Sequence, residues 1–144
     1  ARLGLSYIDA TGSKLAPVMI HSALIGSPER FMGMLIEHYA GAFPFWLAPI
    51  QVRLLSISDK SLSYAKTVAG ALSAAGIRHE LDASASTIGK KIRNAELEKI
   101  PYLLIVGAEE AKNKTVSVRR SGKGDEGSLP LSRFLKKISS ETSR

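Results

Sequence analysis

Residues 51–77 read QVRLLSISDKSLSYAKTVAGALSAAGI, and the fold class follows from this stretch. Residues 52–57 form a short apolar run that predicts a strand. A helix is expected directly afterwards, over 59–75, with Ser58 as its cap and Gly76 at its end. From residue 51 onward the chain therefore begins an alternation of strands and helices, which is typical of an α/β domain.

The alternation continues to the end of the chain. The expected elements are a strand over 77–81, a helix over 88–99, a buried strand over 101–106, an antiparallel or edge strand over 114–120, a turn over 122–127 and a helix marked by apolar residues between 131 and 138. Their sum is a βαβαβ unit with an added strand and helix. This pattern predicts an α/β sandwich around a small, mostly parallel sheet.

A different pattern precedes residue 51. Residues 2–9 and 15–25 are expected to pair as an antiparallel hairpin across a turn. A helix should begin after Ser27, because Pro28 suits the first helical position and Glu29 the first turn. The proline-rich, aromatic segment that follows is interpreted as a packed connector. We therefore expect two domains, residues 1–48 and residues 49–144.

The excess of positive over negative charge is confined to the second of these domains. The net charge is +7; residues 1–48 carry three basic and three acidic side chains, whereas residues 49–144 carry 17 basic and 10 acidic ones. A basic excess in one half indicates a nucleic-acid-binding domain, and the alternative is a basic surface that only aids solubility. Cysteine is absent, which excludes disulfides and suits a cytoplasmic location. The longest apolar stretch, 40–50, is too short to span a membrane.

The junction between hairpin and helix is a candidate anion site. Gly26 allows close approach to the backbone, and the start of the helix offers free N–H groups to a phosphate. Arg30 lies in the first turn, where a cation does not favour the helix, so it is a candidate to bind an anion. The alternative is a capped helix with a surface arginine. His21 could be a metal ligand or a hydrogen-bonded core residue.

Residues 17–51, PVMIHSALIGSPERFMGMLIEHYAGAFPFWLAPIQ, closely resemble motif 3 of threonyl-tRNA synthetases and the segment that leads into their anticodon-binding domain. The resemblance continues through residues 58–60, 75–78, 89–93, 100–102 and 116–120. It implies the C-terminal portion of a class II synthetase. The implied fold is a mixed, mostly parallel five-stranded sheet flanked by three helices, preceded by a hairpin and helix of the catalytic core.

The resemblance also implies roles for residues before the connector. His21 matches a zinc ligand, one of three protein ligands to the zinc that selects threonine. Arg30 matches the catalytic motif 3 arginine that contacts ATP, which is bound with magnesium, and Ser27 lies where the family places a residue near the adenylate. Because the other two zinc ligands and motif 2 are absent, the isolated chain is not expected to bind zinc tightly or to catalyse.

In the second domain, Arg93, Glu110 and Arg119 match positions that face the anticodon of the tRNA. Arginine can pair with or stack on an unstacked base, and glutamate can accept from a base amino group. Lys91 is interpreted as facing a phosphate, with a solvated basic face as the alternative.

Two departures from the family pattern bear on function. Ser22 replaces an arginine, and residues 82–89 read DASASTIG where the family has D-x-R-N-E-K-x-G. Three polar side chains that approach the anticodon are therefore missing or shortened.

Two classes of function follow. The first is part of a cytoplasmic, homodimeric threonine–tRNA ligase that activates threonine with ATP. The second is a non-catalytic RNA-binding module derived from the same domain. A prolyl, glycyl or histidyl synthetase is a further alternative, and the histidine in the motif 3 pattern points to the threonyl branch.

Overall fold

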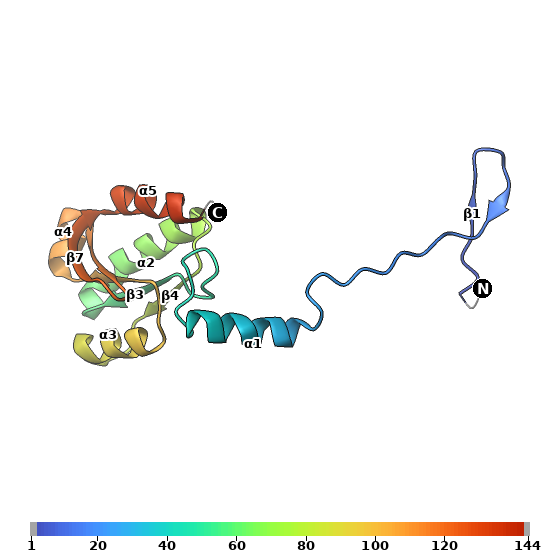
Figure 1. Cartoon of the computed structure of the whole chain (residues 1–144). Coiled ribbons are helices and arrows are strands. Elements are labelled where there is room, and N and C mark those ends of the chain that lie inside the picture. Colours follow the sequence, from blue (N-terminus) through green and yellow to red (C-terminus); the bar gives the residue numbers. More distant parts are fainter. Residues whose placement is uncertain (1–2, 143–144) are drawn as a thin grey trace. The chain divides into compact units, whose positions relative to one another are not determined.

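The computed structural model describes residues 3–142, which form two compact units that divide after Gly33 (Figure 1). That division rests on compactness, and the domain boundary expected after residue 48 stays a prediction. The first unit contains a hairpin of β1 (Tyr7–Ile8) and β2 (Lys14–Leu15), paired antiparallel. The Asp9 carboxylate closes its turn by accepting the N–H groups of Thr11 and Ser13, each at 2.9 Å.

The hairpin is much shorter than the predicted strands over 2–9 and 15–25, of which residue 2 lies outside the described range. Residues 16–23 have no regular structure, and Val18 and Ile20 are about 90% exposed. The physical reason is that a strand needs a neighbour for its N–H and C=O groups, and no described strand pairs with this segment. The prediction of a long second strand is therefore wrong for the isolated chain.

Helix α1 (Pro28–Tyr39) begins at the predicted proline and spans the division between the units. It ends in a left-handed turn, with φ of 48° at Ala40 and 78° at Gly41, and the Gly41 N–H donates to the Ile36 carbonyl. None of its residues is buried, so its apolar side chains are not covered by the rest of the chain.

The second unit is built on a five-stranded sheet in the order β4-β3-β5-β6-β7. The strands are β3 (Val52–Ser56), β4 (His79–Asp82), β5 (Tyr102–Val106), β6 (Thr115–Arg120) and β7 (Gly124–Pro130). Strand β3 pairs parallel with β4 and β5, whereas β6 pairs antiparallel with β5 and β7. The five-stranded mixed sheet is confirmed, but only two of its four pairings are parallel.

Strand β7 occupies part of the segment that was expected to be a turn. Residues 124–127 contain two glycines and two acidic residues, a composition that does not favour a strand. The strand forms because β6 supplies a backbone partner along its length, from Arg120 opposite Gly124 to Thr115 opposite Pro130. Tertiary pairing therefore overrides local propensity here.

Three helices flank the sheet, as predicted: α2 (Asp59–Ala74) and α5 (Leu131–Thr142) on one face and α3 (Ile88–Leu97) on the other (Figure 1). A short helix, α4 (Ala108–Asn113), follows β5 and was not predicted. The larger core, against α2 and α5, includes Leu54, Tyr102, Leu104 and Phe134. The smaller core, against α3, consists of Leu55, Ala95, Ile100 and Leu103 with partly buried isoleucines around it. No helix among residues 3–142 is long and apolar enough to cross a membrane.

The connector before β3 is held on the second unit by two polar side chains. The Arg78 guanidinium donates to the carbonyls of Trp46 (2.7 Å) and Ala48 (2.9 and 3.0 Å). The amide of Gln51, which is 1% exposed, donates to the Phe45 carbonyl and accepts the Arg78 N–H. These bonds confirm the interpretation of this segment as a packed connector.

We expect amide hydrogen exchange in residues 3–25 to be much faster than in Tyr102–Val106. The first segment has two residue pairs of strand and exposed side chains, whereas β5 is hydrogen-bonded on both sides and almost entirely buried. Exchange followed by mass spectrometry or NMR at neutral pH measures the difference. Equal and strong protection in both segments would show that residues 3–25 fold independently.

Candidate nucleic-acid interface

The carboxyl ends of β3 and β5 form a topological switch point. The chain leaves β3 through α2 to reach β4 on one side, then crosses through α3 to β5 on the other side. In open α/β sheets, ligands bind in the crevice outside such carboxyl ends. The first candidate site is therefore the edge formed by Ile57, Gly107 and the residues that follow them.

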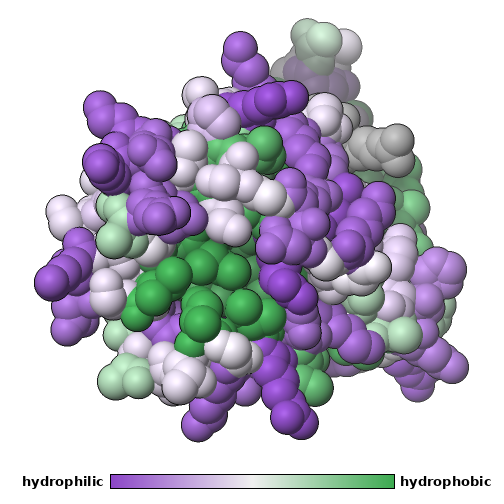
Figure 2. Space-filling model, turned by 90° about the vertical axis from the view of Figure 1, so that its left-hand side faces the viewer, coloured by the Kyte–Doolittle hydropathy of each residue, from purple (hydrophilic) through white to green (hydrophobic). Residues whose placement is uncertain are grey.

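Ile57 and Glu110 meet at Gly107 on this edge. A Cβ at Gly107 would lie 2.9 Å from both Ile57 Cδ1 and Glu110 Oε2, so a larger residue would displace the ends of these two side chains. Ile57 nevertheless stays 54% exposed, which is unusual for a large aliphatic side chain at a strand end. Figure 2 views this side of the molecule and shows a hollowed hydrophobic area framed by hydrophilic side chains. An unstacked base could lie on such a surface.

Glu110 is held in place by the start of α4. Its Oε2 accepts the Gly107 N–H at 2.9 Å, and Oε1 has no hydrogen-bond partner among the described residues. Tyr64 of α2 lies nearby with a buried hydroxyl that has no partner in the same range. Burial, reinforced by the charge of Glu110, raises the pKa of Tyr64 and keeps it protonated. The carboxylate is thus oriented by the backbone and retains one oxygen for a ligand.

The face of the sheet covered by α3 carries a second group of polar residues. Alternation along β6 directs Val116 and Val118 into the larger core, so Arg119 lies on the opposite face. Its Nε is 3.4 Å from Oε1 of Glu96 on α3, and both side chains are one-third to one-half exposed. Arg93 lies one turn before Glu96, is exposed and has no partner among residues 3–142. Arg119 therefore contacts Glu96, and Arg93 lies three residues before Glu96 on the same helix with its charge unpaired in the described range.

An exposed ion pair of this kind contributes little to stability. Arg119 can therefore exchange Glu96 for a base or phosphate at small cost. Glu110 does not join this group directly. Arg119 is opposite Leu103, and Glu110 follows the other end of β5, about four residues or roughly 13 Å away along the strand. The candidate interface thus has two parts, the switch-point edge and the α3 face.

Lys91 corrects a prediction from the sequence. It is 3% exposed, and its Nζ donates to the carbonyls of Ser56 (2.9 Å) and Asp82 (3.1 Å). The side chain turns inward, where these two strand-end carbonyls accept hydrogen bonds from its ammonium group. The ammonium group is hydrogen-bonded inside the fold, so the expectation that it faces a phosphate is wrong for this structure. The neighbouring Lys90 is exposed instead.

The altered loop after β4 lies at the same edge. Asp82 Oδ1 accepts the Ser84 N–H at 2.9 Å and lies 3.7 Å from Lys91 Nζ. Partial burial alone would raise the pKa of Asp82. The hydrogen bonds from Ser84 and the charges of Lys91 and Arg53 outweigh burial and hold that pKa below its usual value. Asp82 is thus an ionised side chain that orders the loop.

Ion pairing leaves the second unit with an excess of unpaired cations. The acidic residues in ion pairs are Glu80, Asp82, Glu96, Glu98, Glu126 and Glu141. The cations without a partner, within the range 49–142, are Lys60, Lys66, Lys90, Arg93, Lys112, Lys114, Lys123, Arg133 and Lys136. Unpaired surface cations are the groups that attract a phosphate backbone.

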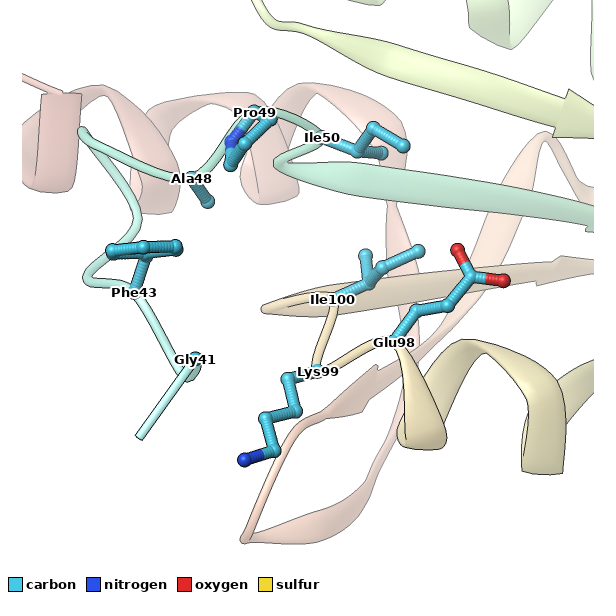
Figure 3. A pocket seen from close by; sticks show the side chains of 8 residues that line it. All are labelled: Gly41, Phe43, Ala48, Pro49, Ile50, Glu98, Lys99 and Ile100. Carbon is cyan, nitrogen blue, oxygen red and sulfur yellow. The ribbon is translucent and has the colours of Figure 1, made fainter. Parts of the chain in front are cut away.

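Two cavities beside the connector do not have the character of a ligand site. The first, of about 120 Å³, is lined by Gly41, Phe43, Ala48, Pro49, Ile50, Glu98, Lys99 and Ile100 (Figure 3). Its charged groups are already used, because Glu98 pairs with Arg53 and Lys99 donates to the Ala40 carbonyl. In the second, of about 180 Å³, Glu141 accepts from both Tyr102 and Arg120. These hollows belong to the packing of the connector.

Comparison with known proteins identifies the family. Residues 51–141 match the family model described as the anticodon binding domain. The chain belongs to this family. It is 54% identical over 94% of its length to threonine–tRNA ligases of Acidobacterium capsulatum and Clostridioides difficile, of which it covers 20% and 21%. The chain thus spans about a fifth of the length of these relatives.

Solved structures agree with this assignment. The anticodon-binding domain described here resembles the RNA binding domain of threonyl-tRNA synthetase from Cryptosporidium parvum, with a TM-score of 0.76 and 40% identity over 83% of this chain and 30% of that one. Prolyl-tRNA synthetase from the same organism matches with a TM-score of 0.63 and 23% identity, over 69% of this chain and 22% of that one. The latter likeness shows the fold alone.

Sequence reasoning missed Ile57 and Gly107 in the anticodon-binding domain. Both end buried apolar strands, and from the sequence Ile57 reads as one more core residue. The signal that could have found them is their position. Each lies at the carboxyl end of a predicted parallel strand, where ligands bind at a switch point.

The residues predicted from motif 3 lie in the first unit. The Ser27 hydroxyl donates to the Glu29 carboxylate, a hydrogen bond that lowers the pKa of Glu29. Arg30 is exposed and has no partner in the described chain. His21 is also exposed, in a segment without regular structure. The structure thus brings Ser27 and Arg30 to one helix start.

The residues of this chain do not fit a zinc ion by themselves. A protein zinc site takes three or four ligands, and no group of three His, Cys, Asp or Glu side chains within residues 3–142 could hold a metal. His21 would supply a single ligand.

We expect the 144-residue chain to show no stoichiometric zinc binding with a Kd below micromolar. Isothermal titration calorimetry at neutral pH measures this, with the His21→Ala variant as the matched control. Tight binding that disappears in the His21→Ala variant would reveal a zinc site that the structure does not form.

Proposed function

We propose that this chain binds the anticodon stem-loop of a tRNA as the C-terminal part of a threonine–tRNA ligase. The observation that carries the proposal is the pair of cations at the α3 surface of an anticodon-binding domain: Arg119 beside Glu96, and the exposed, unpaired Arg93 three residues before Glu96 on α3. The similarity to threonine–tRNA ligases along 94% of the chain supports the threonyl branch.

Binding begins with the electrostatic attraction of the unpaired cations to the RNA backbone. Phosphate contacts of this kind position the RNA but carry no sequence information. The bases are recognised by side chains that are unpaired or that can leave their present partners. Arg119 exchanges its screened contact with Glu96 for a base edge, and Arg93 stacks on or pairs with a neighbouring base.

The switch-point edge contributes the second set of base contacts. Ile57 offers an aliphatic platform for an unstacked base, and the free oxygen of Glu110 accepts from an exocyclic amino group. Gly107 leaves room for the ends of both side chains. An anticodon spans both parts of the interface because its bases are splayed over several ångströms.

In the full-length protein, the first unit would belong to the catalytic core. Arg30 would contact ATP, bound with magnesium, and Ser27 would lie near the adenylate, while His21 would be one of three protein ligands to a zinc that selects threonine. ATP supplies the group that activates the threonine carboxylate. The remaining zinc ligands and the dimer contacts would come from the rest of a cytoplasmic homodimer.

The loop over 82–89 favours one alternative, a non-catalytic RNA-binding module. Its serines and alanines cannot reach bases as arginine, asparagine and lysine do, and Asp82 is engaged within the loop. This alternative predicts electrostatic binding with no preference for threonine anticodons.

We expect Arg119→Ala to weaken binding of a threonine-anticodon stem-loop by about 1–3 kcal/mol and to reduce the preference among anticodons. The matched control is Arg120→Ala, which removes the same charge from the next strand position, on the opposite face beside Glu141. Fluorescence anisotropy at several salt concentrations measures affinity for cognate and non-cognate stem-loops.

Affinity of the unmodified chain should fall steeply with salt. An equal effect of the two variants would show that Arg119 contributes only net charge. Failure of the unmodified chain to bind any stem-loop at low salt would contradict the proposed function.

Restoring the family residues with Ser84→Arg, Ala85→Asn and Thr87→Lys should sharpen the preference for threonine anticodons. The control, Ser73→Arg with Ala74→Lys, adds the same charge at the C-terminal end of α2, away from the loop, where both side chains are exposed. It should strengthen binding of all stem-loops about equally. The ratio of cognate to non-cognate Kd is the measurement. Strong discrimination by the unmodified chain would show that the loop is not needed for reading.

A further inference from the structure

Lys91 is a buried lysine at the edge that we assign to RNA binding. Removing an ammonium group from water costs several kcal/mol unless its donors are satisfied. Here two donors reach the carbonyls of Ser56 and Asp82, and Asp82 Oδ1 lies 3.7 Å away. The site is therefore fully built, and its partners are backbone groups of two different strands.

These two carbonyls end the ladder between β3 and β4. The last paired residues are Leu55 and Asp82, so Ser56 has no partner on the β4 side. Lys91 takes the place of the next strand hydrogen bond and joins both strand ends to α3. Three elements of the fold are thus tied at one nitrogen atom.

Each tied element carries part of the proposed interface. Ser56 directly precedes Ile57, and the Ser56 hydroxyl also donates to the Ser58 carbonyl at 2.9 Å, so the turn around Ile57 is held from both sides. Asp82 begins the loop over 82–87. Arg93 follows Lys91 by two residues on α3.

We infer that Lys91 is a positioning residue for anticodon binding: it touches no RNA, and its ammonium group sets Ile57, the 82–87 loop and Arg93 in one fixed arrangement. This inference rests on the proposed function. It makes the base preference of the domain depend on a lysine that contributes nothing to phosphate contact.

The salt dependence of binding separates positioning from phosphate contact. A lysine that neutralises a phosphate adds about 0.7–0.9 to the slope of log Kobs against log salt concentration. Lys91→Met keeps an unbranched apolar side chain that is one atom shorter and removes the ammonium group. Lys90→Met is the matched control, because Lys90 is the preceding helix residue and is exposed.

We expect Lys91→Met to reduce the cognate to non-cognate affinity ratio at least threefold with an unchanged salt slope. Lys90→Met should leave the ratio unchanged; if Lys90 meets a phosphate, the slope also falls. Binding is measured in the full chain at a temperature where circular dichroism shows both variants to be folded. A lower slope for Lys91→Met, or a lower melting temperature with an unchanged ratio, would overturn the inference.

A second measurement needs no variant to fold. Acylation of the unmodified chain with an amine-specific reagent, read by mass spectrometry, should modify Lys90 readily and leave Lys91 unmodified both with and without the stem-loop RNA. Lys91 that reacts in the free chain and is protected by RNA would contradict the inference. Absence of RNA binding by the unmodified chain contradicts the proposed function itself, whereas binding with an unaltered ratio in Lys91→Met contradicts only the role of Lys91.

Discussion

The burial of β3 and β5 on both faces is the constraint on which the rest of the second unit depends. Leu54 and Leu104 pack against α2 and α5, while Leu55 and Leu103 pack against α3. Two parallel strands can be joined only by crossovers, and helices on both faces are the usual solution. The order of strands, the layers and the position of the switch point follow from covering this pair.

The same constraint decides where polar chemistry can be placed. The cores on both faces of this pair are apolar, so the candidate binding side chains lie at the carboxyl edge or on the α3 side of the sheet. Arg119 illustrates the second case, because its strand has one face in the core and one near α3. Lys91 lies at the carboxyl edge, but its ammonium group points inward and donates to two strand-end carbonyls.

The first unit buries much less apolar surface than the second. Its apolar side chains are mostly exposed, and the one strand pairing among its described residues is two residues long. Burial of apolar surface drives folding, and this segment has no described surface to cover it. The same residues resemble motif 3, so their apolar pattern fits a role inside a larger protein. The connector differs, because Gln51 and Arg78 bind it to the second unit through its backbone carbonyls.

The sequence by itself determined the α/β class, four of the five sheet strands and the helices α1, α2, α3 and α5, because these elements have apolar periodicity and clear caps. The family resemblance also pointed to Arg93 and Arg119, whose role in binding stays a prediction. Only the tertiary structure decided the rest. Strand β7 exists because β6 provides its hydrogen bonds, and residues 16–23 lack a strand because no described strand pairs with them. Ile57 lies beside Gly107 at the carboxyl edge and stays exposed there. The direction of Lys91 is likewise invisible in the sequence, since a lysine in a basic segment predicts solvent exposure. These features depend on hydrogen-bond partners that lie far away along the chain, and the local sequence pattern does not specify such partners.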